Sequence, residues 1–206
     1  QERVLSWAPA SARRSCAARG VFLGYDFHIG DDGPKLIEIN TNAGGGLLNV
    51  RLAKAQRACC EPVAKLMPAR APIEDHFVAM FREEWRLVHG DAPLIRIAIV
   101  DEQPAAQYLA PEFELFRRLF EANGIAAVIA DPAEFVWDGK ALLHGGQPVD
   151  LVYNRLTDFS LDDLTNAPLR AAWEQGAAVI TPHPRAHALY ADKRNLTLLT
   201  DDELLR

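Results

Sequence analysis

Apolar and polar residues alternate along two short stretches near the start of the chain, residues 21–29 and 35–41. A period of two is typical of a β-strand with one buried face. The residues between them, 31–33 (Asp-Asp-Gly), favour a tight turn. The pattern therefore predicts an antiparallel hairpin with a three-residue loop, in which Gly30 faces Pro34.

This register gathers three polar side chains on one face of the hairpin. Counting outward from the turn, Asp26 lies opposite Glu38, and Asn40 follows on the same face. Two carboxylates at facing positions have Cβ atoms only about 5 Å apart, which destabilises the hairpin unless a cation, a proton or a basic side chain compensates. The other face is expected to be an apolar core surface. Its residues are Leu23, Tyr25, Phe27, Ile29, Ile37 and Ile39.

The three polar side chains offer oxygen ligands that suit Mg²⁺ or Mn²⁺, especially where nucleotide phosphates supply the remaining ligands. We therefore predict a metal site formed by Asp26, Glu38 and Asn40. The alternative is an exposed hairpin whose acidic side chains are solvated, or paired with lysine and arginine. The third potential ligand, Asn40, and the glycine-rich exit at residues 44–46 favour the metal site.

The same hairpin carries a resemblance to a known family. The stretches Gly24-Tyr-Asp-Phe and Leu36-Ile-Glu-Ile-Asn-Thr-Asn-Ala-Gly resemble the metal-binding end of the ATP-grasp fold, as in D-alanine:D-alanine ligase and glutathione synthetase. In that family an Asp on one strand and a Glu-x-Asn on the next hold the Mg²⁺ ions that bridge the ATP phosphates. The resemblance, which spans about the first fifth of the chain, implies these roles for Asp26, Glu38 and Asn40.

A second resemblance lies near the other end of the chain. Residues 148–159 are typical of a strand that runs into a polar loop, and residues 177–185 of a strand that ends in prolines. The passage up to Asp192 and Lys193 is similar to the beginning of the ATP-grasp core in glutathione synthetases and related ligases, where the lysine of an Asp/Glu-Lys pair contacts the nucleotide. This similarity implies nucleotide contact for Lys193. An Asp-Lys pair alone is usually a solvated helix cap.

The order of the two matches is circularly permuted, because the metal hairpin leads the chain instead of ending it. This order resembles that of glutathionylspermidine synthetase-like ligases and of uncharacterised proteins similar to them. We expect residues 1–70 to be the C-terminal metal-binding part of a permuted core, 71–182 a pre-ATP-grasp Rossmann-like domain, and 183–206 the incomplete start of the nucleotide-binding half. We also expect a central fragment that binds ATP weakly alone, because no second nucleotide lysine with a glycine-rich flap follows.

Strands and helices alternate from residue 94 to residue 181, which predicts an α/β fold with a Rossmann-like parallel sheet. The turn after its first strand, residues 101–104, lacks the Gly-x-Gly-x-x-Gly fingerprint, which disfavours a Rossmann-like oxidoreductase. Helices are expected both before residue 94 and within this region, and a small hairpin is expected near its middle. The expected helices are 11–19, 47–67, 73–88 and 105–122, and the expected hairpin strands are 135–137 and 141–144.

Ligands of such sheets bind at the carboxyl ends of the strands, where Asp101, Asn154, Arg155 and Asp158 lie. Arg155 is the candidate for a substrate carboxylate, because a guanidinium matches that group bidentately. An ion pair with Asp158 or Asp163 is the equally weighted alternative. The nearby His183 and His187 are interpreted as packing residues, although both are placed to contact nucleotide or substrate.

These features predict an ATP-dependent carboxylate-amine ligase that acts through an acylphosphate. Its cofactors would be ATP and Mg²⁺ (or Mn²⁺), and its substrate a small carboxylate or a peptide-like molecule. The alternative is a non-catalytic ATP-grasp-like binding or regulatory module. The sequence indicates neither which acid and amine are joined nor the oligomeric state.

Composition limits the partners and the setting. The chain has 206 residues, 49% of them apolar, and a formal net charge of −6, which argues against nucleic acid as a partner. No apolar run approaches the roughly 18 residues that a membrane span needs. The three cysteines, Cys16, Cys59 and Cys60, lack the spacing of a zinc site or a disulfide framework, so we expect a cytoplasmic protein.

Overall fold

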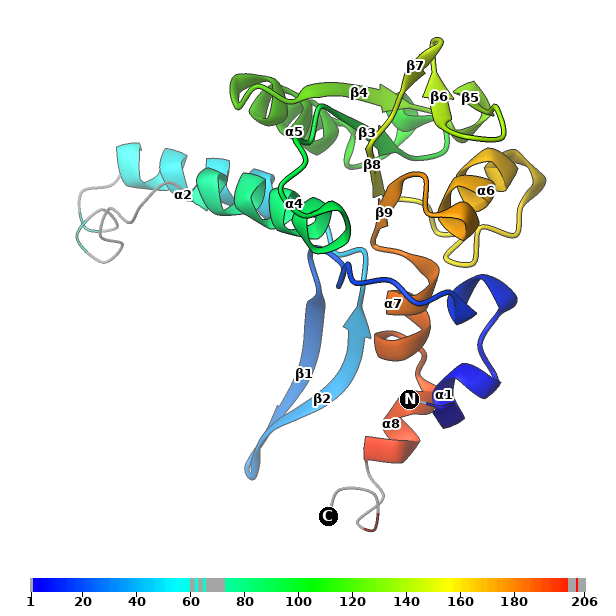
Figure 1. The fold of residues 1–206 in the computed structure, drawn as a ribbon. Helices are drawn as coiled ribbons and strands as arrows, with labels where there is room; N and C mark the ends of the chain where they lie inside the picture. The colour runs from blue at the N-terminus through cyan, green and yellow to red at the C-terminus, as the bar shows by residue number, and fades with distance from the viewer. Residues whose placement is uncertain (1, 60–61, 63–64, 66–72, 200–202, 204–206) are drawn as a thin grey trace.

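The structure is a computed structural model that describes residues 2–59, 62, 65, 73–199 and 203 (Figure 1). Within these residues the protein is α/β, with a four-stranded parallel sheet, a three-stranded antiparallel sheet and a separate two-stranded hairpin. Within the same ranges, no helix has both the length and the apolar character needed to cross a membrane. The predicted α/β class is therefore confirmed, and the expected domain boundaries stay predictions.

The parallel sheet has the order β4-β3-β8-β9. Its strands are β3 (Arg96–Val100), β4 (Ala126–Ala130), β8 (Leu151–Asn154) and β9 (Val179–Thr181). The central strands are almost wholly buried, as continuous apolar runs predict for a sheet covered on both faces. From β3 the chain moves outward to β4 and then returns to the other side of β3 for β8. The carboxyl ends of β3 and β8 therefore form the point at which the strand order reverses.

One face of this sheet packs against α4 (Ile73–His89) and α5 (Ala110–Ala122) (Figure 1). Alternate strand residues point into this core, and the helices contribute aromatic rings that meet edge to face, as Phe81 and Phe120 do at 5.0 Å. The predicted helix at 73–88 is thereby confirmed, and its side chains Phe81 and Trp85 are buried in this core. The strand residues facing these helices are Ile97, Ile99, Leu151, Tyr153 and Val179.

The opposite face packs against α6 (Ala167–Gln175) and a small antiparallel sheet. That sheet contains β5 (Phe135–Trp137), β6 (Leu142–His144) and β7 (Gln147–Pro148), so the predicted hairpin gains a third strand. Trp173 of α6 is fully buried here, and its indole N–H donates to the carbonyl of Ser11 at 2.9 Å. This bond fixes the N-terminal segment against α6.

The N-terminal segment contains less helix than the sequence predicts. The short helix α1 (Glu2–Ser6) was not expected, and the expected helix 11–19 is only the 3-10 turn η1 (Ala10–Arg13). The physical reason lies in α4, where the buried Glu84 accepts hydrogen bonds from the backbone N–H groups of Arg19 and Gly20 at 2.8 and 2.9 Å. These bonds hold the chain in an extended course.

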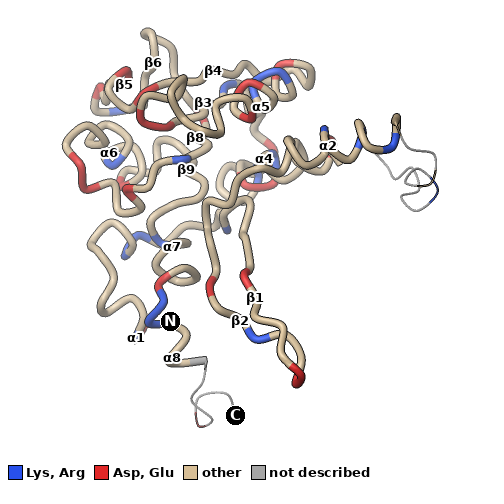
Figure 2. Tube along the Cα trace, turned by 180° about the vertical axis from the view of Figure 1, so that it is seen from behind, with Lys and Arg blue, Asp and Glu red and all other residues tan. Residues whose placement is uncertain are grey.

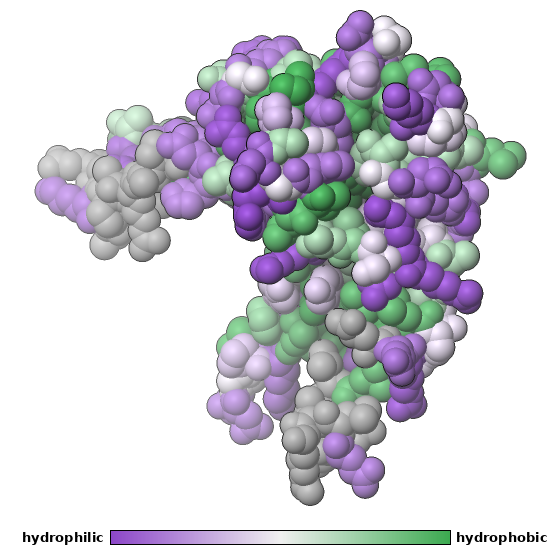
Figure 3. All heavy atoms as spheres, in the orientation of Figure 1, coloured by the Kyte–Doolittle hydropathy of each residue, from purple (hydrophilic) through white to green (hydrophobic). Residues whose placement is uncertain are grey.

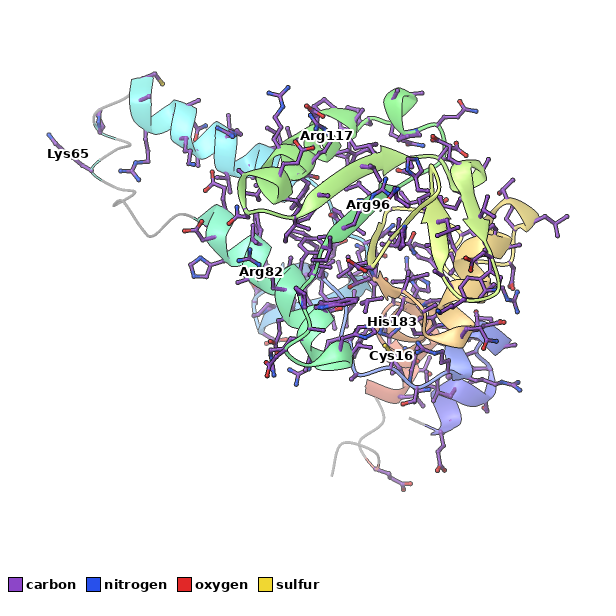
Figure 4. All side chains as sticks on the ribbon, turned by 45° about the horizontal axis from the view of Figure 1, so that its top comes forward. Cys16, Lys65, Arg82, Arg96, Arg117 and His183 are labelled. Atoms are coloured by element: carbon purple, nitrogen blue, oxygen red, sulfur yellow. The ribbon has the colours of Figure 1, made fainter. Side chains whose placement is uncertain are left out.

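Two further helices complete the C-terminal end, α7 (Pro184–Tyr190) and α8 (Arg194–Leu199). His183 caps α7 by accepting from the N–H of Ala186, and its other ring nitrogen lies 2.9 Å from the carbonyl of Ala18. The contact with Ala18 places His183 against the N-terminal segment, and Figure 4 labels it on the ribbon. Burial lowers the pKa of His183. The packing interpretation of His183 agrees with these contacts.

The helix α2 (Gly46–Cys59) begins at the glycine-rich exit of the hairpin and extends away from the sheet (Figure 1). The carboxylate of the buried Glu112 on α5 accepts from the N–H groups of Gly45 and Leu47 at 2.6 and 2.8 Å, which caps the start of α2. Most of the predicted helix beyond Cys59, up to residue 67, lies outside the described residues.

The predicted hairpin is present as β1 (Gly24–Gly30) and β2 (Gly33–Asn40). Asp26 faces Glu38 and Gly24 faces Asn40, as predicted. The turn differs, because Gly33 pairs with Gly30 and the loop has two residues instead of three. A bulge at Ile37 absorbs the difference and restores the register at Asp26.

The expectation that the apolar face of the hairpin packs on the core is wrong. The hairpin projects from the body (Figure 1), and its distal apolar residues are exposed, with Phe27 at 50% and Ile29 at 72%. Hydrophobic surface remains visible along the upper part of the hairpin, while its tip is polar (Figure 3). Alternation thus predicted the strands correctly but not what covers them.

Candidate metal and nucleotide site

Three polar side chains meet on one face of the β1–β2 hairpin. The Asn40 amide nitrogen lies 3.0 Å from a carboxylate oxygen of Glu38 and 3.5 Å from one of Asp26. Acidic positions stand at matching heights on the two strands (Figure 2). The hairpin register alone brings these residues together, because facing positions and their neighbours two residues along share one face.

A fourth polar group reaches this face from the other end of the chain. The Lys193 Nζ lies 2.7 Å from Glu38 Oε2, with the Lys193 side chain 73% exposed and that of Glu38 25% exposed. The hydrogen bond with Lys193 is the main cause that lowers the pKa of Glu38, and the same bond raises the pKa of Lys193. Of the three ways to compensate facing carboxylates, the structure shows a basic side chain together with the Asn40 amide.

The position of Lys193 follows from the packing of α7 against β2. Thr41, which is buried directly after β2, has its hydroxyl oxygen 3.0 Å from His187 Nδ1 on α7. The His187 ring stacks on Phe159 with centroids 3.7 Å apart, and burial lowers the pKa of His187. Lys193 lies three residues beyond the end of α7 at Tyr190. His187 thus has a packing role that also sets where Lys193 lies.

The donor set can be tested against a divalent cation. Within the described part of the chain, no group of three or more His, Cys, Asp or Glu side chains is placed to hold a metal ion. The hairpin instead offers two carboxylates and one amide, which fits Mg²⁺ because this ion keeps several waters and uses substrate phosphates as ligands. For metal binding, Lys193 would leave Glu38 and the Asn40 amide would present its oxygen.

Removing the lysine tests this competition directly. In Lys193→Met we expect the Glu38 pKa to rise toward its ordinary value, because its main cause of lowering is lost. Divalent cations without nucleotide should then bind roughly threefold more tightly. Carboxyl-detected NMR titration and Mn²⁺ binding measure the two effects. Lys35→Met is the matched control, because Lys35 pairs with Asp32 at the tip of the same hairpin. An unchanged Glu38 pKa in Lys193→Met would contradict the pairing.

The hairpin leads directly into a second group of polar residues. Asn40 and Ala43 are three residues apart along the chain, so their Cα atoms are at most about 11 Å apart. The Ala43 carbonyl accepts from Arg155 Nη1 at 3.0 Å. Arg155 follows β8, so this bond joins the exit of the hairpin to the carboxyl edge of the parallel sheet. The structure brings the hairpin residues and Lys193 into direct contact, whereas Arg155 lies in this adjoining site.

Arg155 lies at an open pocket of about 370 Å³ at that edge. Neither of the ion pairs considered for it is formed, because Asp158 accepts from Ser160, Asn166 and the Asp163 N–H. Asp163 itself caps the turn at Thr165. The other residues that line the pocket are Asn42, Asp101, Glu102, Gln107, Tyr108, Leu109 and Thr157.

Gly44 allows the close approach at this junction. A Cβ atom at Gly44 would lie 2.4 Å from Leu109 Cδ1 and 2.9 Å from Arg155 Nη2, so a side chain requires both neighbours to move. We expect Gly44→Ala to destabilise the fold by about 1–3 kcal/mol through overpacking. Chemical denaturation measures this. Gly30→Ala is the control, since its nearest neighbour would be 3.8 Å away; equal effects of the two changes would contradict the packing argument.

Asp101 faces the same pocket from the end of β3. Burial raises its pKa from 3.8 to about 6, although the Glu102 N–H and the Arg155 charge lower it. The charges of Glu102 and Asp131 raise it further. The folded state therefore holds the Asp101 proton more tightly than the unfolded chain does, which marks a carboxylate without sufficient compensation.

This shift gives a pH-dependent stability. Because the folded pKa is raised, the penalty is absent below about pH 4 and complete above about pH 6. Asp101→Asn should therefore stabilise the fold near neutral pH by about 1 kcal/mol, after allowance for solvent screening at this half-buried group. The gain should disappear at about pH 4. Thermal unfolding of both proteins at the two pH values measures it, and an equal gain at both would contradict the origin in ionisation.

Comparison with models of known protein families gives no match, and comparison with curated proteins gives no significant match. Sequence reasoning found Asp101 and Arg155 by their place at strand ends, but it missed the buried carboxylates Glu84 and Glu112. Both lie on the core sides of amphipathic helices, where only an acidic residue among apolar ones signals them.

Proposed function

We propose that this chain carries the metal-binding face and a nucleotide lysine of an ATP-grasp type ligase, which joins a small carboxylate to an amine through an acylphosphate. The observation that supports this best is the contact of Lys193 with Glu38 at 2.7 Å. The family resemblance assigns one residue to the nucleotide and the other to the metal, and the two come from opposite ends of the sequence. Their meeting on one face is what a permuted ATP-grasp core requires.

The chain's own residues have distinct parts in this proposal. Asp26, Glu38 and Asn40 would hold Mg²⁺ or Mn²⁺, which when bound neutralises charge on the transferred phosphate. Lys193 is mostly exposed, so its ammonium is free to exchange the Glu38 carboxylate for a phosphate oxygen. Arg155 would orient the substrate carboxylate from the adjoining pocket. In this proposal the substrate binds at the carboxyl edge of the parallel sheet, and the nucleotide binds between the hairpin and Lys193.

A non-catalytic binding module is the second candidate. The observation that favours it is the same ion pair, because the Lys193 ammonium and the Asn40 amide compensate the hairpin carboxylates without any metal. In such a module these residues would fix α8 and the hairpin together. Nucleotide binding without consumption would identify this case.

Titration with Mg-ATP followed by measurement of ADP separates the candidates. The 206-residue chain and any longer natural polypeptide that carries it are both to be tested. A ligase is expected to form ADP only with Mg²⁺ or Mn²⁺, and faster with its carboxylate and amine substrates. Binding without ADP formation supports the module. If neither protein binds ATP and neither forms ADP, the ATP-grasp assignment is contradicted.

A further inference from the structure

The pocket at the carboxyl ends of β3 and β8 lies where parallel α/β sheets bind ligands, at the reversal of strand order. Val100 and Asn154 are paired at the ends of these strands, so the next residues, Asp101 and Arg155, leave neighbouring strands at the same height. Neighbouring strands are about 4.8 Å apart. An acidic and a basic side chain thus stand side by side at the mouth of one pocket of about 370 Å³.

Arg155 is buried without an anionic partner. Its residue is only 7% exposed, and its Nε is buried with no hydrogen-bond acceptor. Its Nη1 donates to two neutral oxygens, those of Ala43 at 3.0 Å and of the Tyr153 hydroxyl at 3.5 Å. Among the described residues, no ion pair involves Arg155. Because buried charges in proteins are normally paired, this guanidinium points to an anionic ligand.

Asp101 likewise lacks an ion-pair partner among the described residues. Its carboxylate accepts from the Glu102 N–H at 2.9 Å, and it forms no ion pair with Arg155, its oppositely charged neighbour. Burial leaves its charge undercompensated. A simple anion would satisfy Arg155 but leave Asp101 as it is, and a simple cation would do the reverse. A ligand that carries both charges close together satisfies the two residues at once.

We infer that this pocket binds the zwitterionic head group of an α-amino acid, with the carboxylate on Arg155 and the ammonium on Asp101. The pocket also lies at the N-terminal end of α5, whose helix dipole favours the carboxylate. Tyr108 at the rim is 94% exposed and offers apolar surface to the side chain of the ligand. The inference deepens the proposed function, on which it rests, by naming the class of substrate.

Binding is to be measured without ATP or metal, so that it does not depend on turnover. The probes are the common free α-amino acids, followed for the tightest binder by its α-amide, which lacks the carboxylate, and its N-acetyl form, which lacks the ammonium. Isothermal titration should give at least about tenfold weaker binding for each derivative. The inference is overturned if no amino acid binds, or if either derivative binds as tightly as the zwitterion.

Variants assign the two charges. Asp101→Asn should weaken the amino acid about tenfold and leave the N-acetyl form unchanged, because only the ammonium contact is lost. Glu102→Gln tests the other acid that lines the pocket, and its effect should be smaller because Glu102 is exposed. Asp32→Asn, in the turn of the hairpin, is the matched control and should not change the affinity. If Glu102→Gln has the larger effect, the assignment to Asp101 is wrong. Arg155→Lys, checked for folding by circular dichroism, should weaken the amino acid and the N-acetyl form alike.

The binding test and the ATP test fail independently. Amino acid binding without any ATP binding or consumption would keep this pocket and reject the ligase. ATP consumption without amino acid binding would keep the ligase and reject this substrate class.

Discussion

Replacing Glu38 by glutamine is expected to reduce Mg²⁺-dependent ATP consumption by about 100-fold or more, while the fold remains intact. The change removes one of the two carboxylates on the proposed metal face but keeps the size of the side chain. A neutral amide neither balances the charge of a divalent cation nor pairs with Lys193 as the carboxylate does. Steady-state ADP formation measures the loss, and circular dichroism verifies the fold.

The matched control for Glu38→Gln is Asp32→Asn. Asp32 lies in the turn of the same hairpin, with a side chain 88% exposed and 3.7 Å from Lys35. Its loss removes the same charge from the same element without touching the proposed metal face. We expect unchanged turnover in Asp32→Asn. Equal turnover in Glu38→Gln and the natural protein would remove Glu38 from the metal site.

Replacing Glu84 by glutamine is expected to destabilise the protein by about 3 kcal/mol. The buried carboxylate accepts from the N–H groups of Arg19 and Gly20 and from the Thr181 hydroxyl, all within 2.9 Å. Both oxygens of the Glu84 carboxylate accept hydrogen bonds. In glutamine an N–H₂ group replaces one oxygen, so at least one of these donors loses its acceptor. For a chain of this size the melting temperature should fall by roughly 6–12 °C.

The adjacent Glu83 provides the control for this prediction. Glu83→Gln makes the same chemical change on the same helix, but Glu83 is exposed and forms a surface ion pair with Arg86. Since surface ion pairs contribute little to stability, the melting temperature should not change. An equally small effect of Glu84→Gln would show that Glu84 does not hold the N-terminal segment on α4.

Local patterns predicted much of the fold. Period-two alternation and the turn residues identified the hairpin. The predicted pairing of Asp26 with Glu38 is present only because the bulge at Ile37 offsets the shorter turn. The alternation of strand and helix patterns identified the parallel sheet, and α4 lies where a helix was expected. These signals depend on neighbours along the chain, which a single sequence contains.

The remaining features depend on contacts between distant residues. The bulge at Ile37 is a compromise between the tight turn and the register at Asp26, and no single residue signals it. The exposure of the hairpin depends on which other parts of the chain pack against it. The contact between Lys193 and Glu38 requires that α7 pack on β2. The sequence predicted separate roles for Lys193 and Glu38 but did not predict their contact.

Paramagnetic NMR with Mn²⁺ and ATP tests the central claim most directly, because it locates the metal without relying on activity. Mn²⁺ broadens signals from nuclei near it, and Mg-ATP provides the diamagnetic reference. If Asp26, Glu38, Asn40 and Lys193 form the site, substoichiometric Mn-ATP should selectively broaden the backbone amides of residues 25–27, 37–41 and 193. Broadening elsewhere while these signals stay unchanged, or no broadening at all in a longer natural polypeptide that carries the chain, would contradict the claim.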